Sequence, residues 1–233
     1  MVIRNGKRAI LEKQLQGLQT QILTLGSLVS EALLLSSNIL KNKDLAGAKT
    51  LILADQGINQ RWIDIQRNCL RIIATQNPIA SDLRFVSACL EIASELERMH
   101  DYAKGIAKVT IIMGNETEVV FPNELSQMAQ VAQKMLHLAL DALIQQNVEL
   151  ALSVAANDDH IDALYEQIYH NLLGLDQQGT WMASHAHHLL WAAHNLERAG
   201  DRVTNICEWI VYFVTGQRLE MNTNHDVMSF DFH

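Results

Sequence analysis

The chain has 233 residues, of which 48% are apolar and 19% charged, and its formal net charge is -8. This composition is sufficient to build a globular core, and the acidic balance excludes a typical nucleic-acid binder, because affinity for phosphate backbones comes mainly from Lys and Arg. Only two prolines and eleven glycines are present, which favours long helices because both residues are costly inside a helix.

The amino terminus, MVIRNGKRAILEKQ, lacks the apolar segment of a signal peptide. By inspection, no stretch approaches the roughly 20 apolar residues of a membrane-spanning helix. We therefore expect a cytoplasmic protein without direct membrane insertion. Its three cysteines stand in no metal-binding spacing, so we expect them to be reduced core residues: Cys69, Cys89 and Cys207.

Apolar positions recur at helical spacing through the first half of the chain and predict a first helix over about 10–40. Asp44 is a plausible N-cap for a second helix that runs to Gln76, because its side-chain oxygen can accept from the amides of the first turn. Ser81 is the next plausible cap, and the third helix continues to about Met113.

The helical pattern fails at GNETEVVFPN, residues 114–123, which we interpret as a linker between repeats. A fourth helix is predicted over 124–146, and Asn147 is a plausible cap for a fifth helix that ends near Leu173. The segment LDQQGT then forms a turn, and a sixth helix is predicted over 181–215.

The two halves match each other. Asp44 aligns with Asn147, and Asp55 aligns with Asp158, both at an offset of 103 residues, whereas the third helices align at an offset of 100. The difference of three predicts a shorter turn in the second half. We therefore predict an all-α protein of two tandem three-helix bundles packed side by side, with a first repeat over 1–113, a linker over 114–123, a second repeat over 124–216 and a tail over 217–233.

Pairs of acids recur on the predicted helices. Residues at i and i+4 lie on one helix face, where like charges repel unless a cation lies between them. Acids on two neighbouring helices would form an oxygen-rich cation site suited to magnesium, manganese or iron, or to zinc if His194 joins. The pairs are Glu97 with Asp101, Asp158 with Asp162, and Glu197 with Asp201.

The first half is the weaker candidate for a metal site. Asn59 stands where the second half has Asp162, and Lys108 stands where it has Glu208. An amide brings an oxygen but no charge, and a lysine adds a positive charge. If one site alone is occupied, we expect it in the second half.

Two other interpretations of these side chains stay open. The acids could be solvated and paired with Arg98, Arg198 or Arg202, although their duplication at matched places favours a cation site. His185 and His188 share a helix face, but two histidines are too few for a closed zinc site without further ligands.

Two segments resemble the signatures of the PhoU family of phosphate-uptake regulators. LERAGDRVTNICEWIVYFVTG, residues 196–216, is similar to the family's second signature, and QNPIASDLRFVSACLEIASELERMHD, residues 76–101, is similar to its first. The duplicated layout extends the resemblance over nearly the whole chain. The first signature is carried by Pro78, Ala80, Ser81, Asp82, Leu83 and Arg84.

The resemblance implies two three-helix bundles whose acidic segments hold multinuclear iron or zinc clusters at the surface. Asn59, His100 and Gly105 depart from the family pattern and weaken the expectation for the first half. Carried over by position, the metal ligands are Asp55, Glu97 and Asp101 in the first half, and Asp158, Asp162, Glu197 and Asp201 in the second.

The resemblance also implies a regulatory role rather than catalysis. Family members associate with the ATPase of the phosphate ABC transporter and with a membrane sensor histidine kinase, and they keep starvation genes off when phosphate is plentiful. The sequence fits this role, because it lacks a phosphate-cradling glycine loop and a GxSxG elbow. Family habit and the apolar run WIVYFV at 209–214 favour a homodimer.

The sequence leaves two alternative functions open. A ferritin-like di-iron protein needs two ExxH motifs, but Glu97 with His100 is the single ExxH pair of this kind, since Gly200 follows Glu197 at the matched place. A metal-free helical adaptor would instead use the acidic faces to dock basic regions of its partners.

Overall fold

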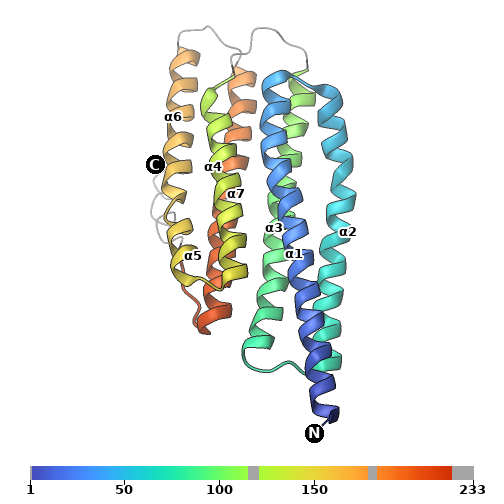
Figure 1. Cartoon of the computed structure of the whole chain (residues 1–233). Coiled ribbons are helices and arrows are strands. Elements are labelled where there is room, and N and C mark those ends of the chain that lie inside the picture. The colour runs from blue at the N-terminus through green and yellow to red at the C-terminus, as the bar shows by residue number, and fades with distance from the viewer. Residues whose placement is uncertain (1, 115–120, 178–182, 222–233) are drawn as a thin grey trace, which may run out of the picture.

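The computed structural model describes residues 2–114, 121–177 and 183–221, and within them it contains helices and no strand. Figure 1 shows the helices running up and down side by side. The all-α prediction is confirmed. The helices are α1 (Val2–Asn42), α2 (Leu45–Gln76), α3 (Ser81–Met113), α4 (Asn123–Gln145), α5 (Val148–Ala155), α6 (Asp158–Gln177) and α7 (Ala183–Thr215).

The two halves pack through equivalent helices. α1 lies against α4, and α3 lies against α7, while α2 and α6 stand at the two outer edges (Figure 1). The contact between α3 and α7 is the most extensive of all helix pairs within the described residues. The tandem bundles therefore meet through a central layer of four helices, with α2 on one outer side and α5 and α6 on the other.

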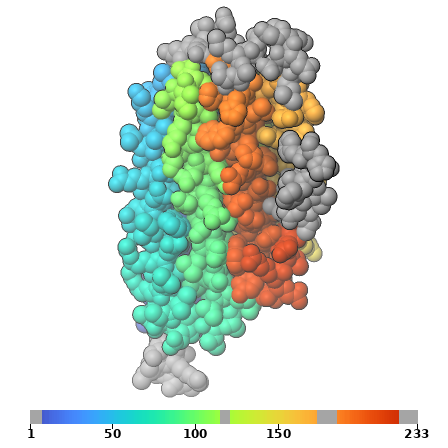
Figure 2. All heavy atoms as spheres, turned by 180° about the vertical axis from the view of Figure 1, so that it is seen from behind, coloured from blue at the N-terminus to red at the C-terminus, as the bar shows by residue number. Residues whose placement is uncertain are grey.

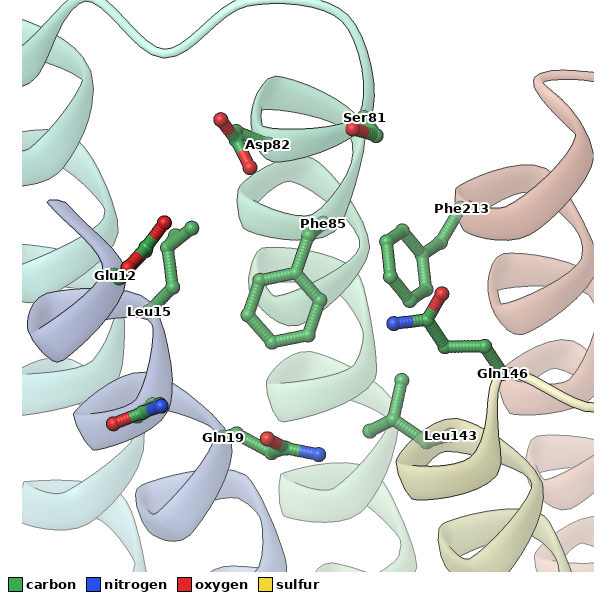
Figure 3. A pocket seen from close by; sticks show the side chains of 10 residues that line it. Glu12, Leu15, Gln19, Ser81, Asp82, Phe85, Leu143, Gln146 and Phe213 are labelled. Carbon is green, nitrogen blue, oxygen red and sulfur yellow. The ribbon is translucent and has the colours of Figure 1, made fainter. Parts of the chain in front are cut away.

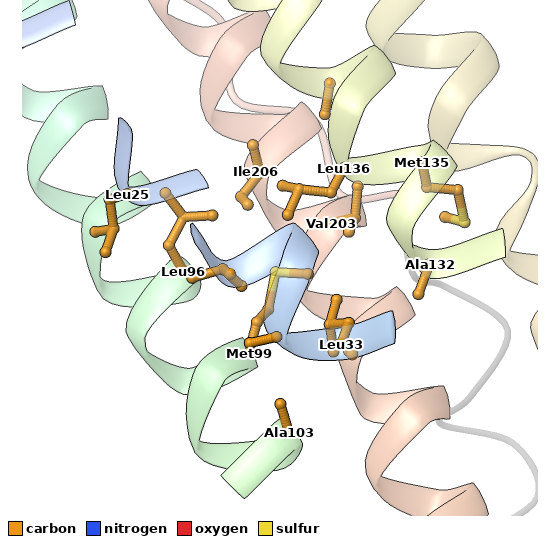
Figure 4. Packing of buried hydrophobic residues seen from close by; sticks show 14 of the residues in the cluster. Leu25, Leu33, Leu96, Met99, Ala103, Ala132, Met135, Leu136, Val203 and Ile206 are labelled. Carbon is orange, nitrogen blue, oxygen red and sulfur yellow. The ribbon is translucent and has the colours of Figure 1, made fainter. Parts of the chain in front are cut away.

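One hydrophobic cluster runs through this central layer and is shared by both halves. Figure 4 shows its side chains converging from all four central helices. Shared burial explains why the bundles lie side by side, because each half alone would expose the apolar faces of its central helices. The residues labelled there include Leu25 and Leu33 of α1, Leu96 and Met99 of α3, Leu136 of α4, and Val203 and Ile206 of α7.

The helix ends follow the predicted caps in three places. The side chain of Asp44 accepts a hydrogen bond from the amide of Gly47 at 2.9 Å, and Asn147 accepts from the amide of Leu150 at 3.0 Å. α2 ends at Gln76, where Asn77 takes a left-handed conformation with φ of 46°. These contacts satisfy amides that a helix start leaves without a partner in the helix.

Two predicted boundaries were wrong. Ser81 is the first residue of α3 rather than its cap, and the cap position is Ala80, which makes no side-chain capping bond. The predicted fifth helix is broken at 156–157 into α5 and α6, where the amide of Asn157 donates to the carbonyl of Ser153 at 2.8 Å. This side-chain bond satisfies a carbonyl at the end of α5 and competes with continuation of the helix.

The predicted turn LDQQGT lies partly within α6, which continues to Gln177. The rest of that turn and Trp181 fall outside the described residues. The predicted linker 114–123 begins where α3 ends, and α4 starts at Asn123. Residues 115–120 within it are also outside the described part of the chain, so the repeat boundaries stay a prediction.

One helical segment, Arg8–Asn42, is long and apolar enough to cross a membrane when it is judged by length and composition alone. The expectation that no stretch approaches that size was therefore wrong for α1. Within the bundle, 56% of the most apolar part of this segment is buried. The apolar side of α1 packs against α2, α3 and α4.

Candidate functional site

Both predicted acid clusters lie where an outer helix meets a central one. The first is built from α2 and α3, and the second from α6 and α7. Figure 2 shows α2, α3 and α7 side by side on one face of the molecule. We define the first-half cluster as Asp55, Glu97 and Asp101, and the second-half cluster as Asp158, Asp162, Glu197 and Asp201.

A lysine forms ion pairs with two acids of the first-half cluster. The ammonium nitrogen of Lys104 donates to Asp55 Oδ2 at 2.8 Å and to Asp101 Oδ1 at 2.5 Å. The contact with Asp55 has the length of a charge-assisted hydrogen bond. The lysine side chain is only 19% exposed, so screening by water is reduced. The structure therefore brings Asp55 and Asp101 together around a cation that belongs to the chain itself.

Asp55 has further donors of its own. Nδ2 of Asn59, one turn along α2, donates to Asp55 Oδ2 at 3.1 Å. The ring Nδ1 of His100 donates to Asp55 Oδ1 at 3.2 Å, and this ring is 2% exposed. Both oxygens of Asp55 thus accept hydrogen bonds within the protein. His100, one of the departures from the family pattern, is a structural partner of this carboxylate.

Burial and the neighbouring charges shift the pKa values of the side chains in the first-half cluster. Burial by itself raises the pKa of Asp55, but the hydrogen bonds and charges of Lys104 and His100 lower it below its ordinary value. Burial and the nearby charges of Asp101 and Asp55 raise the pKa of Glu97. Burial opposes the charge of Lys104, but bonds to Asp101 and Asp55 raise its pKa overall. The lysine is therefore held in its charged form.

The second-half cluster has no lysine at the matched place. Position 204 is a threonine, whose hydroxyl donates to Asp158 Oδ2 at 3.4 Å. The matched place of His100 is Gly200, and a Cβ added there would lie 2.6 Å from Asp158 Oδ1 and 2.8 Å from Ile161 Cδ1. The buried carboxylate of Asp158 therefore lies directly against α7, in space that any larger residue at position 200 would fill.

Asp201 follows Gly200 on α7, and Asp162 and Glu197 lie farther along the same contact. Burial raises the pKa of Tyr165 on α6, and the charge of Glu197 raises it further. This part of α6 therefore faces the middle of α7. Asp162 lies on α6 between Asp158 and Tyr165, and it therefore stands at the level of the Glu197 to Asp201 turn. Nδ1 of His194 lies 3.1 Å from Glu197 Oε2, and burial lowers the pKa of His194, which favours the neutral imidazole that metals bind.

The two clusters fit a metal ion differently. The second-half cluster offers carboxylate oxygens from two helices, a nearby imidazole and a glycine that lets the helices approach, and this donor set suits iron, zinc, manganese or magnesium. The first-half cluster does not fit, because its cation position is taken by Lys104. Within the described residues, no three acidic, histidine or cysteine side chains already converge in a metal-binding geometry.

The predicted reason for the difference between the halves was partly wrong. Lys108 is exposed, and the lysine that pairs with acids of the first-half cluster is Lys104, one turn earlier on α3. Glu208, the counterpart of Lys108, is buried and accepts a hydrogen bond from the amide of Met221 at 2.8 Å. The sequence signal was available, because Lys104 follows Asp101 at i+3 whereas Thr204 follows Asp201.

The predicted first signature lies beside a hollow of about 260 Å³ between the ends of α1, α3, α4 and α7. Figure 3 shows Phe85 and Phe213 facing each other in it, with ring centroids 5.1 Å apart. Asp82 forms an ion pair with Arg8 of α1 at its rim. This end of α3 is therefore tied to another helix of its own half and, through the rings, to α7 of the other half.

Arg84, also from that signature, joins the two halves directly. Its Nε donates to the carbonyl oxygen of Phe213 at 3.1 Å, in the last turn of α7. A cation at a helix C-terminus is favourable because the last carbonyls lack partners in the helix and carry partial negative charge. The role of Arg84 in this fold is to cap α7, and Phe213 at the end of α7 is buried against Phe85 of the first half.

The family model for the PhoU domain matches this chain twice, over residues 22–110 and 125–210. The two matches correspond to the two halves defined by the helices. Together they cover most of the chain, and they confirm the predicted resemblance and the tandem repeat.

Relatives extend the similarity over almost the full length. The chain is 31% identical over 216 residues to a Clostridium acetobutylicum protein named phosphate-specific transport system accessory protein PhoU homolog, covering 92% of this chain and 99% of that relative. It is 35% identical over 214 residues to a Zymomonas mobilis protein of the same name, covering 91% and 90%.

A solved structure confirms the architecture. The crystal structure of the phosphate transport system regulatory protein PhoU from Streptococcus pneumoniae matches with a TM-score of 0.84 and 32% identity, covering 90% of this chain and 99% of that one. All these relatives are named as accessory or regulatory proteins, which confirms the prediction that the chain is not an enzyme.

Proposed function

Because the chain belongs to the PhoU family, we propose that it is a negative regulator of phosphate uptake and of phosphate-starvation signalling. The observation that carries this proposal is the match to PhoU proteins along both halves. Relatives named as accessory proteins of the phosphate-specific transport system support the coarser part, a regulatory role in phosphate uptake.

The regulator acts by protein contact in the cytoplasm. Its partners are the ATPase subunit of the phosphate ABC transporter and a sensor histidine kinase, and it reaches the membrane through them. A net charge of -8 supports contact with basic partner surfaces rather than with anionic lipid or nucleic acid. We also propose a homodimer, which light scattering on the purified protein tests by its molar mass.

Gene deletion tests the regulatory proposal directly. In the source organism, alkaline phosphatase reporter activity in phosphate-replete medium should rise when this gene is deleted and return to its low level when the intact gene is restored. A catalytically dead reporter gene provides the background control. Unchanged repression after deletion would contradict the proposal for this chain.

The second-half cluster is the proposed metal site of the regulator. Asp158, Asp162, Glu197 and Asp201 would hold iron or zinc, with manganese or magnesium as alternative occupants. A bound metal would supply positive charge to a contact that otherwise carries four carboxylates. The close approach of Asp158 to Gly200 supports this proposal, since it holds a carboxylate of α6 against α7.

Elemental analysis of purified protein tests the metal proposal. The substitution Asp201→Asn should lower the bound iron or zinc, because it removes one charged ligand without changing the size of the side chain. Asp159→Asn is a matched control, since Asp159 is exposed on the same outer helix as two of the proposed ligands. Equal metal content in all three proteins would contradict the proposal.

A metal-free adaptor is the alternative for the same regulatory role. In that case the acidic faces dock basic regions of the partners. Binding of the transporter ATPase that survives complete chelation and is weakened by Asp201→Asn would favour the adaptor over the metal site.

A further inference from the structure

Lys104 occupies the position that a metal ion would need in the first-half cluster. Its ammonium nitrogen lies 2.8 Å from Asp55 Oδ2 and 2.5 Å from Asp101 Oδ1. A metal ion that bridged the same oxygens would stand roughly 2.0 to 2.6 Å from each of them. The ammonium group and the metal ion cannot share that space, so metal binding there requires the lysine to leave.

Neighbouring side chains make this arrangement difficult to reopen. Asn59 and His100 donate to the two oxygens of Asp55. A metal bound through Asp55 would compete with these donors as well as with Lys104. An ammonium group has three donor hydrogens and no acceptor, so it cannot itself become a ligand at that position.

The second half differs at all three matched places. Thr204 stands for Lys104, Gly200 for His100 and Asp162 for Asn59. The first change replaces an ammonium group by a neutral hydroxyl that still donates to Asp158. The second removes the imidazole donor, and the third replaces a neutral amide by a carboxylate. Both halves of the repeat therefore carry the acids, but the lysine contact is present in the first half and its matched place in the second half is a threonine.

We propose that Lys104 is a built-in cation that keeps the first-half cluster free of metal, so that this chain loads metal in its second half alone. Metal loading in the second half rests on the metal site proposed there, whereas the exclusion of metal from the first half rests on Lys104 and its neighbours. The first-half cluster is then a fixed contact between α2 and α3, and the molecule is functionally asymmetric.

Binding of Mn²⁺ to the chelated full-length protein tests this proposal, because Mn²⁺ favours carboxylate oxygen and the free ion can be counted by electron paramagnetic resonance. The test uses the Asp201→Asn background to silence the second half. In that background, Lys104→Thr copies the residue of the second half and should raise the affinity for Mn²⁺ by about tenfold or more, since it removes a positive charge from the site. The further change Asp101→Asn should abolish the gain.

Lys108→Thr is the matched control, because it removes the same charge from an exposed position one turn along α3. It should leave the affinity unchanged. If Lys104→Thr fails to fold by circular dichroism, Lys104→Gln provides the second variant, since it removes the charge but keeps a polar side chain of similar length. A gain with Lys108→Thr equal to that with Lys104→Thr would overturn the proposal.

Two further results separate this inference from the proposed metal site. If the native chain binds no Mn²⁺ but Lys104→Thr does, the proposed second-half site fails and the role of Lys104 stands. If the native chain binds Mn²⁺ and neither Lys104 variant adds binding, the role of Lys104 fails and the second-half site stands. Binding that Asp101→Asn lowers in the native chain as much as Asp201→Asn does would also overturn the inference.

Discussion

The two acid clusters show how one repeat can support different electrostatic solutions. In the first half, Asp55 and Asp101 share the ammonium group of Lys104. In the second half, Asp158 meets a threonine hydroxyl and the bare backbone of Gly200. An outer helix meets a central one at both clusters, so a few side chains at the contact set a different charge balance in each half.

Gly200→Ala should give the largest loss of stability. The added Cβ would lie 2.6 Å from Asp158 Oδ1, and overpacking of this kind costs about 2 to 3 kcal/mol. Urea unfolding followed by circular dichroism measures the change. Gly57→Ala is the control, because nothing lies within 4 Å of its Cβ position, and it should stabilise α2 by up to about 1 kcal/mol. Equal changes in the free energy of unfolding for the two substitutions would contradict the close contact between Gly200 and Asp158.

Asp55→Ala should have the next largest effect in chelated protein. It leaves Lys104 and His100 without their shared acceptor in a partly buried site, which should cost about 2 kcal/mol. Asp64→Ala is a matched control on the same helix. Asp64 pairs with Arg67 at 3.0 Å, but both side chains are largely exposed, so its loss should stay within about 0.5 kcal/mol. A loss as small as that of the control would show that Lys104 does not hold the first-half cluster together.

Removing either of the two helix caps should lower stability by a similar amount, because the two halves differ in their acid clusters and not in these caps. Asp44→Ala and Asn147→Ala each remove a side-chain acceptor at a helix start, at 2.9 and 3.0 Å respectively. Each should cost about 1 kcal/mol. Thermal unfolding of both variants measures the change, and a difference of more than about 1 kcal/mol between them would show that the halves differ in local stability as well.

The smallest difference between the two halves is expected in the reactivity of their cysteine thiols. Burial raises the pKa of Cys69 in the first half and of Cys207 in the second to about 12. Cys89 is also buried and free, which confirms the predicted reduced core. Because the thiolate is the reactive form, iodoacetamide at pH 8 should leave the folded protein unmodified and label it only in urea, as mass spectrometry would reveal. Rapid labelling of either half in native protein would contradict this packing.

Much of the fold could be predicted from sequence because helix signals are local. The caps Asp44 and Asn147 and the stop at Asn77 depend on a residue's own side chain or backbone preference. The break before α6 escaped prediction because the apolar period continues through it, although Asn157 offered a signal. Ser81 resembles a cap, but the chain enters α3 through Ala80 in an unusual conformation with φ of 48°.

The acids of the candidate site could be predicted from the sequence. The positive charge that Lys104 brings to them could not. The spacing of Glu97 with Asp101 places both on one face, and the repeat indicates which outer-helix residues meet them. The i,i+3 spacing of Asp101 and Lys104 allows their ion pair, but spacing does not reveal that Lys104 also reaches Asp55 on the neighbouring helix. That contact depends on packing between α2 and α3, which is a tertiary property.

An anomalous X-ray diffraction map of native protein grown with iron and zinc tests the asymmetry of the two clusters most directly. The account predicts metal peaks between α6 and α7, beside Asp158 and Asp201, and none between α2 and α3. A peak of comparable height bridging Asp55 and Asp101, with Lys104 displaced from both, would contradict it.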